Sequence, residues 1–498
     1  MSFRTSARRL SLVALALFVI LAAAILVNTL RFTSKQPDFS AIEPISVDAA
    51  AAAQRLSSAV QLKTISHQNP EDATDQPFIE LIELISSHYP QVALHLERTL
   101  INQKSLLFKW PGSNAALKPI TFLAHHDVVP PEAISIGQWT YPPFSGAIEE
   151  GFIWGRGALD DKASVFGVLE AVEHLIASGF KPARTVYLAF GHDEEIGGDQ
   201  GAAFIAQYMA KHNISSLFTL DEGMVVLDSR LSPAKKPTAI IGIAEKGYLT
   251  LKITAKVTGG HTSMPTPISS TGTLAKAITA LEENQRPSGI TGAAEHMFNF
   301  LGPEMSLVEK TLLANRWLFD GVITFILEQQ HSTAAMIRTT TAVSMIHAGV
   351  KENVLPSQAT AMVNFRIIPG ETSEDVIRHA NAVIANSAVT VERSMLSIDN
   401  EPSAISAADT AAFLAIGVTA RQLFPGSIFA PGLVLGGTDS VHYQAVADNN
   451  YRFAPYVMAP EDLSRIHGVN ERIKIADYQR MIQFYAQLIL NMDSINAN

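Results

Sequence analysis

The stretch ITFLAHHDVVP, residues 120–130, joins an apolar, strand-like run to an abrupt polar end. Its first five residues are apolar, and His125, His126 and Asp127 follow directly. Because alternate residues of an extended segment face the same side, His125 and Asp127 point one way and His126 the other. A histidine that ligates a metal is often oriented by a carboxylate at its second ring nitrogen. The pattern predicts that His125 and Asp127 work as a pair, although a hydrogen-bonded structural histidine would look the same.

Four further segments of the chain contain clusters of acidic residues or a histidine in a polar loop. They are WGRGALDDK (154–162), FGHDEEIGG (190–198), FTLDEGM (218–224) and RIHGVNER (465–472). Each acidic cluster lies where a predicted strand or loop ends, and ligands of open α/β sheets bind at the carboxyl ends of the strands. Any one cluster alone also suits a helix N-cap or a solvated acidic turn. Together they predict one site at one edge of a sheet.

The donors in these clusters are sufficient for two divalent ions. If Asp160 bridges them, one ion takes His125 and Asp221 and the other takes Glu195 and His467. Imidazole and carboxylate donors suit Zn²⁺, and Co²⁺ or Mn²⁺ would also fit them. Glu194, beside a ligand but facing elsewhere, is then available as a general base.

Composition narrows the class of protein. A chain of 498 residues is too long for one compact core, so at least two folded units are expected. A net charge of −10 gives no electrostatic support for binding nucleic acid. The absence of cysteine excludes disulfides and thiolate metal sites, so any metal must be held by histidines and carboxylates.

The N-terminal segment is long enough to cross a membrane. Residues 10–30 carry no charge and would form a helix of about 31 Å. Arginines at positions 4, 8 and 9 precede it, which favours a cytoplasmic N-terminus and an extracytoplasmic remainder. We expect an uncleaved single-pass signal anchor. A cleaved signal peptide, which would make the protein secreted, is the alternative.

Hydrophobic periodicity predicts the organisation of the rest. After the anchor (1–31) and a linker (32–47), strands and helices alternate over 48–246, which favours a mainly parallel sheet in an α/β domain. Alternating strands at 247–257 and 360–370, with helices between and after them, predict a smaller inserted α+β domain over 247–395. The α/β domain then resumes over 396–498. The apolar segment 298–327 either lines a pocket or packs on itself.

The motifs together resemble those of the di-zinc metallopeptidases that include carboxypeptidase S, glutamate carboxypeptidase, aminoacylase and the N-fatty-acyl-amino-acid hydrolases. The matching stretches are HHDVVP (125–130), GRGALDDK (155–162), DEEIGG (193–198), LDEG (220–223), GGHTSMP (259–265) and IHGVNE (466–471). They occur in the family's order and span most of the chain after residue 90. LDEG, the helix-rich insert and the anchor make the carboxypeptidase S branch the most similar.

The resemblance implies a role for each matching residue. It implies metal ligation by His125, Asp160, Glu195, Asp221 and His467, a catalytic base at Glu194, and an orienting carboxylate at Asp127. It also implies a cis peptide between Asp160 and Asp161. For the substrate it implies contacts from His261, Asn353 and Arg366, with His261 often acting from a neighbouring subunit of a homodimer. Each of these three also suits a plain surface or turn position. The resemblance further implies that the insert over 247–395 is a lid or dimerisation domain and that the surrounding α/β domain is catalytic.

The resemblance implies hydrolysis of the amide bond next to the C-terminal amino acid of short peptides. An N-acyl-amino-acid amidohydrolase, which could also run toward synthesis, is the alternative enzyme. A catalytically inactive, membrane-tethered binding protein is the alternative of another class. No predicted ligand or base is missing from the chain, which favours an enzyme.

Overall fold

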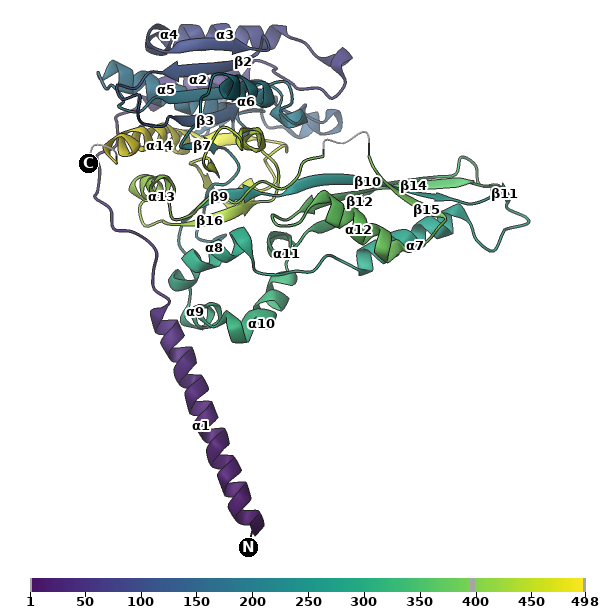
Figure 1. Cartoon of the computed structure of the whole chain (residues 1–498). Coiled ribbons are helices and arrows are strands. Elements are labelled where there is room, and N and C mark those ends of the chain that lie inside the picture. The colour runs from purple at the N-terminus through teal and green to yellow at the C-terminus, as the bar shows by residue number, and fades with distance from the viewer. Residues whose placement is uncertain (1, 395–398, 496–498) are drawn as a thin grey trace.

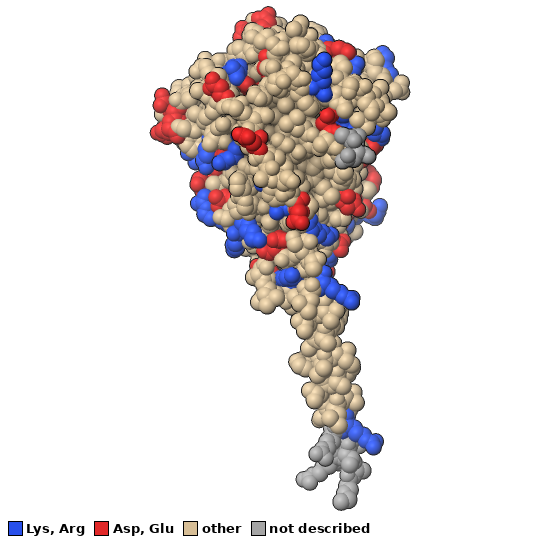
Figure 2. Space-filling model, turned by 90° about the vertical axis from the view of Figure 1, so that its left-hand side faces the viewer, with Lys and Arg blue, Asp and Glu red and all other residues tan. Residues whose placement is uncertain are grey.

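The computed structural model describes residues 2–394 and 399–495. Helix α1 (Ser2–Arg31) extends as a stem from the folded body (Figure 1). Its residues Arg9–Arg31 are long and apolar enough to cross a membrane. Figure 2 shows no Lys, Arg, Asp or Glu on the visible face of this stem between its charged ends. The predicted domain boundary at 395/396 lies outside the described residues.

A mixed ten-stranded sheet forms the centre of the body, and its middle is parallel as predicted. The strand order is β1-β2-β6-β3-β7-β17-β9-β8-β18, with β16 beside β9. The parallel strands at its centre are β6 (Val186–Gly191), β3 (Ile120–His125), β7 (Phe218–Asp221) and β17 (Asn450–Arg452). Strands β3, β6 and β7 are buried along their whole length, because helices cover both faces of a parallel sheet.

The remaining strands of this sheet complete its two sides. They are β1 (Glu97–Ile101), β2 (Ser105–Trp110), β8 (Val226–Leu227), β9 (Thr238–Glu245), β16 (Ile428–Val434) and β18 (Val457–Met458). A separate short sheet contains β4 (Ile148–Glu149), β5 (Phe152–Trp154) and β19 (Arg472–Lys474).

Helices cover the central sheet. They are α2 (Ala49–Val60), α3 (Gln76–His88), α4 (Pro90–His95), α5 (Lys162–Ala177), α6 (Ala202–Lys211), α13 (Ala411–Leu423) and α14 (Ile475–Ser494). Helix α5 is buried over most of its surface, because it lies against β3 and also packs on α14, α2 and α4. The Asp48 side chain caps α2 by accepting a 3.0 Å hydrogen bond from the Ala51 amide.

A second, four-stranded antiparallel sheet projects to one side (Figure 1). Its order is β12 (Thr340–Ala348), β14 (Gln358–Ile367), β10 (Gly247–Lys256) and β15 (Val389–Arg393). Helices α7 (Ser270–Glu283) and α12 (Ser373–Ile384) pack on it and share a hydrophobic cluster with it. At its tip, β11 (Gly260–His261) pairs with β13 (Val354–Leu355). The predicted strands near 247 and 360 are therefore confirmed as strands.

Four α-helices lie between α7 and β12 in the sequence. They are α8 (Gly292–Leu301), α9 (Leu307–Ala314), α10 (Arg316–Glu328) and α11 (His331–Ile337). Helix α8 packs on β16, and its buried residues belong to the same hydrophobic cluster as the central sheet. In Figure 1, α9 and α10 lie at the end of the body from which α1 extends.

Candidate metal centre

His125 ends strand β3 at the carboxyl edge of the central sheet, and its side chain is buried. Its Nε2 lies 3.0 Å from Asp160 Oδ1, 3.5 Å from Glu222 Oε1 and 3.9 Å from Glu194 Oε2. Glu194 and Glu222 follow directly after β6 and β7, which are neighbours of β3 in the sheet. The predicted meeting of polar strand ends at one sheet edge is therefore what the structure shows.

Asp127 occupies the position expected of an orienting carboxylate. Its Oδ1 lies 3.3 Å from His125 Nδ1, the ring nitrogen that faces away from the other carboxylates. The same carboxylate accepts hydrogen bonds from the Glu194 and Glu195 amides, each at 3.2 Å, and from the Ser66 hydroxyl. Asp127 therefore fixes the imidazole of His125 and the turn that carries the two glutamates.

His126 faces the other way, as the strand alternation predicted. It is fully buried and packs edge-on against the Phe78 ring, with centroids 5.8 Å apart. Its ring nitrogens have no hydrogen-bond partner among the described protein residues, and burial lowers its pKa to about 3. His126 is a neutral core residue here.

His467 approaches Asp160 from the opposite side. Its Nε2 lies 3.0 Å from Asp160 Oδ2 and 3.2 Å from Glu195 Oε2. The two oxygens of Asp160 thus each face a different imidazole, although His125 and His467 are more than 300 positions apart in the sequence.

Three overlapping sets of donor atoms result, each compact enough for a metal ion. They are His125, Asp160 and Glu222; His125, Glu194 and Glu195; and Asp160, Glu195 and His467. Within each set the donors lie within 4.8 Å of one another. Asp160 belongs to two of the sets, which is the arrangement that a bridging carboxylate requires.

Asp221 does not join these sets, although the sequence pointed to it. Its Oδ2 accepts a 2.8 Å hydrogen bond from the Ser440 amide, and its Oδ1 accepts one from the Glu222 amide at 3.0 Å. Each oxygen thus accepts one backbone hydrogen bond, and Asp221 joins β7 to the loop at 436–440. Glu222, the next residue in the sequence, supplies the carboxylate near His125.

A buried ion pair holds the loop that carries Asp160. Glu471 is fully buried and accepts hydrogen bonds from the Gly157, Leu159 and Asp160 amides at 2.8–3.2 Å. Arg156 donates to Glu471 at 2.5 Å and to the His467 carbonyl at 2.8 Å. The peptide between Asp160 and Asp161 is cis, as the resemblance implied.

Glu471, Arg156 and Ser66 are site residues that the sequence analysis did not assign. Glu471 and Arg156 lie inside the matching stretches IHGVNE and GRGALDDK, so a signal for them existed. Ser66 follows no recognisable pattern, because its hydroxyl reaches the site through a bond to Asp127 across 61 residues.

The predicted substrate residues are not among the metal donors of the single chain, as far as the structure describes it. His261 and Asn353 are exposed at the tip of the second sheet, where Asn353 accepts a hydrogen bond from the Thr262 amide. Arg366 is half-buried on β14, and its guanidinium stacks over the Tyr248 ring at 4.4 Å. None of the three belongs to the donor sets found among the described residues.

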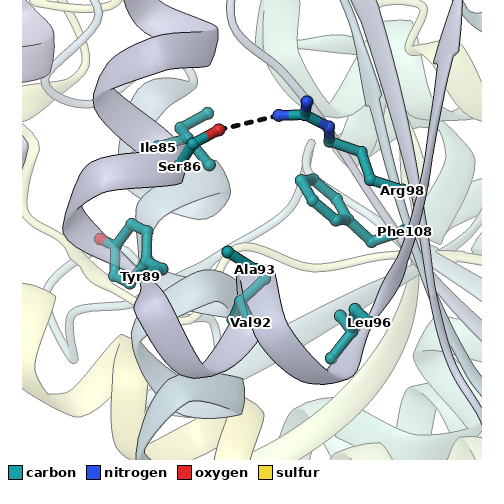
Figure 3. A pocket seen from close by; sticks show the side chains of 8 residues that line it. All are labelled: Ile85, Ser86, Tyr89, Val92, Ala93, Leu96, Arg98 and Phe108. Atoms are coloured by element: carbon teal, nitrogen blue, oxygen red, sulfur yellow. Dashed lines mark hydrogen bonds between the residues drawn. The ribbon is translucent and has the colours of Figure 1, made fainter.

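A cavity of about 380 Å³ lies elsewhere, between α3, α4 and the first two strands (Figure 3). Its lining mixes polar and apolar surface, and the Arg98 guanidinium donates to the Ser86 hydroxyl across it at 2.8 Å. It contains none of the metal donors, so it is not part of the candidate centre.

The electrostatics of the centre favour a bound cation. Burial, together with the neighbouring carboxylates, raises the pKa of Glu194 well above its ordinary value and that of Glu222 to about 7. For Asp160, burial also acts to raise the pKa, but hydrogen bonds with His125 and His467 outweigh it and lower the pKa. Crowded carboxylates beside imidazoles are stabilised in their charged form by divalent cations, so the donor set fits two such ions.

Known proteins similar to this chain share one activity class. Residues 121–491 match peptidase family M20/M25/M40. The chain is 39% identical over 479 residues to the probable carboxypeptidase S-like 2 of Dictyostelium discoideum, covering 94% of this chain and 91% of that protein. It is also 39% identical over 449 residues to the N-fatty-acyl-amino acid synthase/hydrolase PM20D1 of Xenopus tropicalis, covering 89% and 86%.

A solved structure shares the fold. The M20 family metallo-carboxypeptidase Sso-CP2 from Sulfolobus solfataricus superposes with a TM-score of 0.64 at 18% identity, covering 90% of this chain and 100% of that chain. The arrangement of the elements described above is therefore one that known metallo-carboxypeptidases also adopt.

Binding of a divalent cation at pH 7 should release protons from this centre. Hydrogen bonds to Asp160 and Glu195 raise the pKa of His467 to about 10, so the ring is charged at pH 7. A ligating imidazole must be neutral, so a cation displaces that proton. The ion pair of His467 stabilises the metal-free fold fully below pH 6.5, and this contribution is lost as pH rises through about 10.

The number of released protons can be measured by calorimetric titration with Zn²⁺ in buffers of different ionisation enthalpy. At pH 7 we expect at least about one released proton per chain. Replacement of the exposed His296, on α8, by Gln is the control and should leave the count unchanged. A count of zero would contradict the charged state of His467.

Proposed function

The chain belongs to peptidase family M20/M25/M40 and is a metal-dependent hydrolase, and we propose that it cleaves the amide bond next to a free carboxylate. One observation carries the proposal. Asp160 lies between His125 and His467, each about 3.0 Å away, and the carboxylate of Glu194 is adjacent to His125. Such a constellation can hold two metals and place a base beside them.

The donor sets support a specific ligand assignment. Asp160 is the shared ligand, His125 and Glu222 complete one position, and Glu195 and His467 complete the other. Here Glu222 takes the role that the sequence analysis gave to Asp221, because Glu222 groups with His125 and Asp160 while the oxygens of Asp221 each accept a backbone hydrogen bond. Zn²⁺ suits these nitrogen and oxygen donors best, and Co²⁺ or Mn²⁺ would also suit them.

Two divalent cations held in this way would polarise the scissile carbonyl and make a water molecule more acidic. Glu194 accepts a proton from that water, and the oxygen then attacks the amide carbon. Glu194 next donates the proton to the amine nitrogen as the carbon–nitrogen bond breaks. Asp127 contributes by holding both the His125 ring and the backbone of Glu194 in place.

The substrate's carboxylate is the expected partner of Arg366, whose guanidinium fork matches carboxylate geometry. We propose that the segment 247–395 acts as a lid and dimerisation domain and that His261 and Asn353 contact substrate. Both are exposed at the tip of the second sheet, away from the metal donors of their own chain. This separation supports action in a homodimer, with His261 serving the site of the partner subunit.

Short peptides are the first substrate class, because the Dictyostelium relative is named for a carboxypeptidase. N-fatty-acyl amino acids are the second, because the similarity to the Xenopus synthase/hydrolase covers nearly as much of the chain. Both classes present an amide next to a free carboxylate, so the same metal centre serves either one.

We further propose that α1 anchors the protein in a membrane, with the N-terminus in the cytoplasm and the catalytic body on the other side. The 23-residue segment Arg9–Arg31, which is apolar enough to cross a membrane, supports a span, and the arginines at its N-terminal side support the orientation. In a processed, secreted form this helix would be removed.

Hydrolysis of a substrate panel tests the proposed function. The full-length protein should release the C-terminal amino acid from dipeptides, from N-fatty-acyl amino acids, or from both. Glu194→Gln should lower kcat by about 100-fold or more, because the variant cannot accept the water's proton. Full activity of that variant would refute the base assignment, and amidated substrates, which lack the carboxylate, serve as the control.

The choice between Glu222 and Asp221 can be tested by metal content. Glu222→Gln should weaken binding of the second ion by at least about tenfold, because a charged ligand is lost. Asp221→Asn should lower thermal stability while retaining two ions, since its oxygens contact backbone amides. If elemental analysis showed the reverse pattern, Asp221 would be the ligand.

Mixing two inactive variants tests action across a dimer. His261→Ala and Glu194→Gln chains each lack one group, but a mixed dimer contains one intact site. Random exchange should therefore restore about a quarter of the wild-type rate, because half of the dimers are mixed. If subunit exchange is verified and no activity returns, His261 does not act in trans.

A further inference from the structure

One face of helix α10 is apolar and open to solvent. Its exposed residues recur at positions 317, 318, 321, 322, 325 and 326, a spacing that places them on one side of a helix. Five of them are large: Trp317, Leu318, Val322, Phe325 and Ile326, with exposed fractions from 42% to 63%. Leu307 and Val308 at the start of α9, at 73% and 70%, are further exposed apolar residues of the same hairpin.

This surface, here called the α9–α10 face, is not explained by the fold. The sequence analysis left the segment 298–327 as either a pocket lining or a self-packed core, but only part of it is buried. Contiguous apolar surface of this kind on a folded protein marks a contact with another protein or with a membrane. Arg316 does not break the apolar face, because it is directed to Glu295 and to the Ile290 carbonyl of the body.

The α9–α10 face lies next to the last turn of α1. Asn315, fully buried between α9 and α10, is the joint between them. Its side chain accepts a 3.0 Å hydrogen bond from Asn28 and donates to the Ile25 carbonyl at 3.2 Å. Helix α1 packs directly on α9, so the proposed membrane span and the hairpin form one joined unit (Figure 1).

The segment after α1 is bound to the body and is not a free tether. Gln36 makes two hydrogen bonds with the backbone of Phe429, at 2.8 and 3.0 Å. Arg421 donates to the Pro37 carbonyl at 2.5 Å, and Gln483 donates to the Ile45 carbonyl at 2.9 Å. These contacts fix the orientation of the catalytic body relative to α1, so the same face always points along the stem.

The length of the apolar span sets the level of the bilayer. Residues 10–27 form a helix of about 27 Å, which is slightly shorter than the thickness of a hydrocarbon core, about 30 Å. The core must therefore reach almost to Asn28, which is the residue bonded to Asn315. A surface attached at that point lies at the boundary between hydrocarbon and headgroups.

We propose that the α9–α10 face docks on the surface of the bilayer in which α1 is anchored. Trp317 and Phe325 are side chains suited to the interfacial layer, and the remaining aliphatic residues enter the acyl boundary. The proposal rests on the proposed anchoring by α1 and extends it, because it makes the catalytic body itself a membrane-contacting surface. A second copy of the chain is the competing occupant.

Site-specific fluorescence on the full-length chain tests this docking. The protein has no cysteine, so one probe site can be introduced at a time. Val322→Cys and Phe325→Cys place an environment-sensitive dye on the face. Leu94→Cys is the matched control, because Leu94 is an apolar helix residue with 76% exposure on α4, away from α1. Each variant is reconstituted in phosphatidylcholine vesicles, and retained hydrolysis verifies its fold.

Nitroxide attached to the lipid acyl chains should quench the dye at positions 322 and 325 by about twofold or more and leave position 94 unchanged. Equal, weak quenching at all three positions would overturn the proposal. A blue-shifted dye at 322 that lipid nitroxide does not quench would also overturn it, in favour of a contact between two chains.

Vesicle flotation in the same samples distinguishes failure of the membrane anchor from failure of the docking. If the chain floats and position 322 stays unquenched, the anchor holds and the docking fails. If the chain does not float, the anchor fails and the docking fails with it. Hydrolysis measured in either case reports on the proposed catalytic function independently.

Discussion

The site depends on one carboxylate that two distant imidazoles share. Asp160 presents one oxygen to His125 and the other to His467, each at 3.0 Å. Around this contact the chain gathers Glu194, Glu195 and Glu222, whose burial raises the pKa of each. Such a concentration of carboxylates is unfavourable unless positive charge compensates it, so the fold that builds this cluster is one that requires cations at its centre.

The scaffold supports this contact through a few backbone-directed bonds. Asp127 links the end of β3 to the turn carrying Glu194 and Glu195, and Glu471 accepts three amides of the loop carrying Asp160. Both carboxylates are fully buried. Asp127 and Glu471 therefore position the metal donors without themselves contacting a substrate. The donors are in place before any metal or substrate binds.

The second sheet and the helical segment at α8–α10 are built separately from the metal centre. The second sheet carries His261 and Arg366 on a projecting unit with its own hydrophobic cluster, whereas α8 packs into the core of the central sheet. The helical segment next to α8 is attached to α1 through Asn315. The proposed substrate contacts, the candidate metal centre and the proposed anchor thus depend on three different packing arrangements within one chain.

The sequence by itself determined the elements and most of the site. The buried runs before His125, Glu194 and Asp221 identified parallel strands, and strand alternation separated His125 and Asp127 from His126, because these patterns depend only on neighbouring residues. Only the tertiary structure showed that Glu222 lies near His125 while Asp221 accepts a hydrogen bond from the Ser440 amide, which lies 219 positions away in the sequence. It also decided that His261 lies apart from the metal donors and that one face of α10 remains uncovered. Distant segments set the direction of a side chain that follows the last paired residue of a strand. They also set which surface covers an apolar helix face. A local sequence pattern contains no information about either.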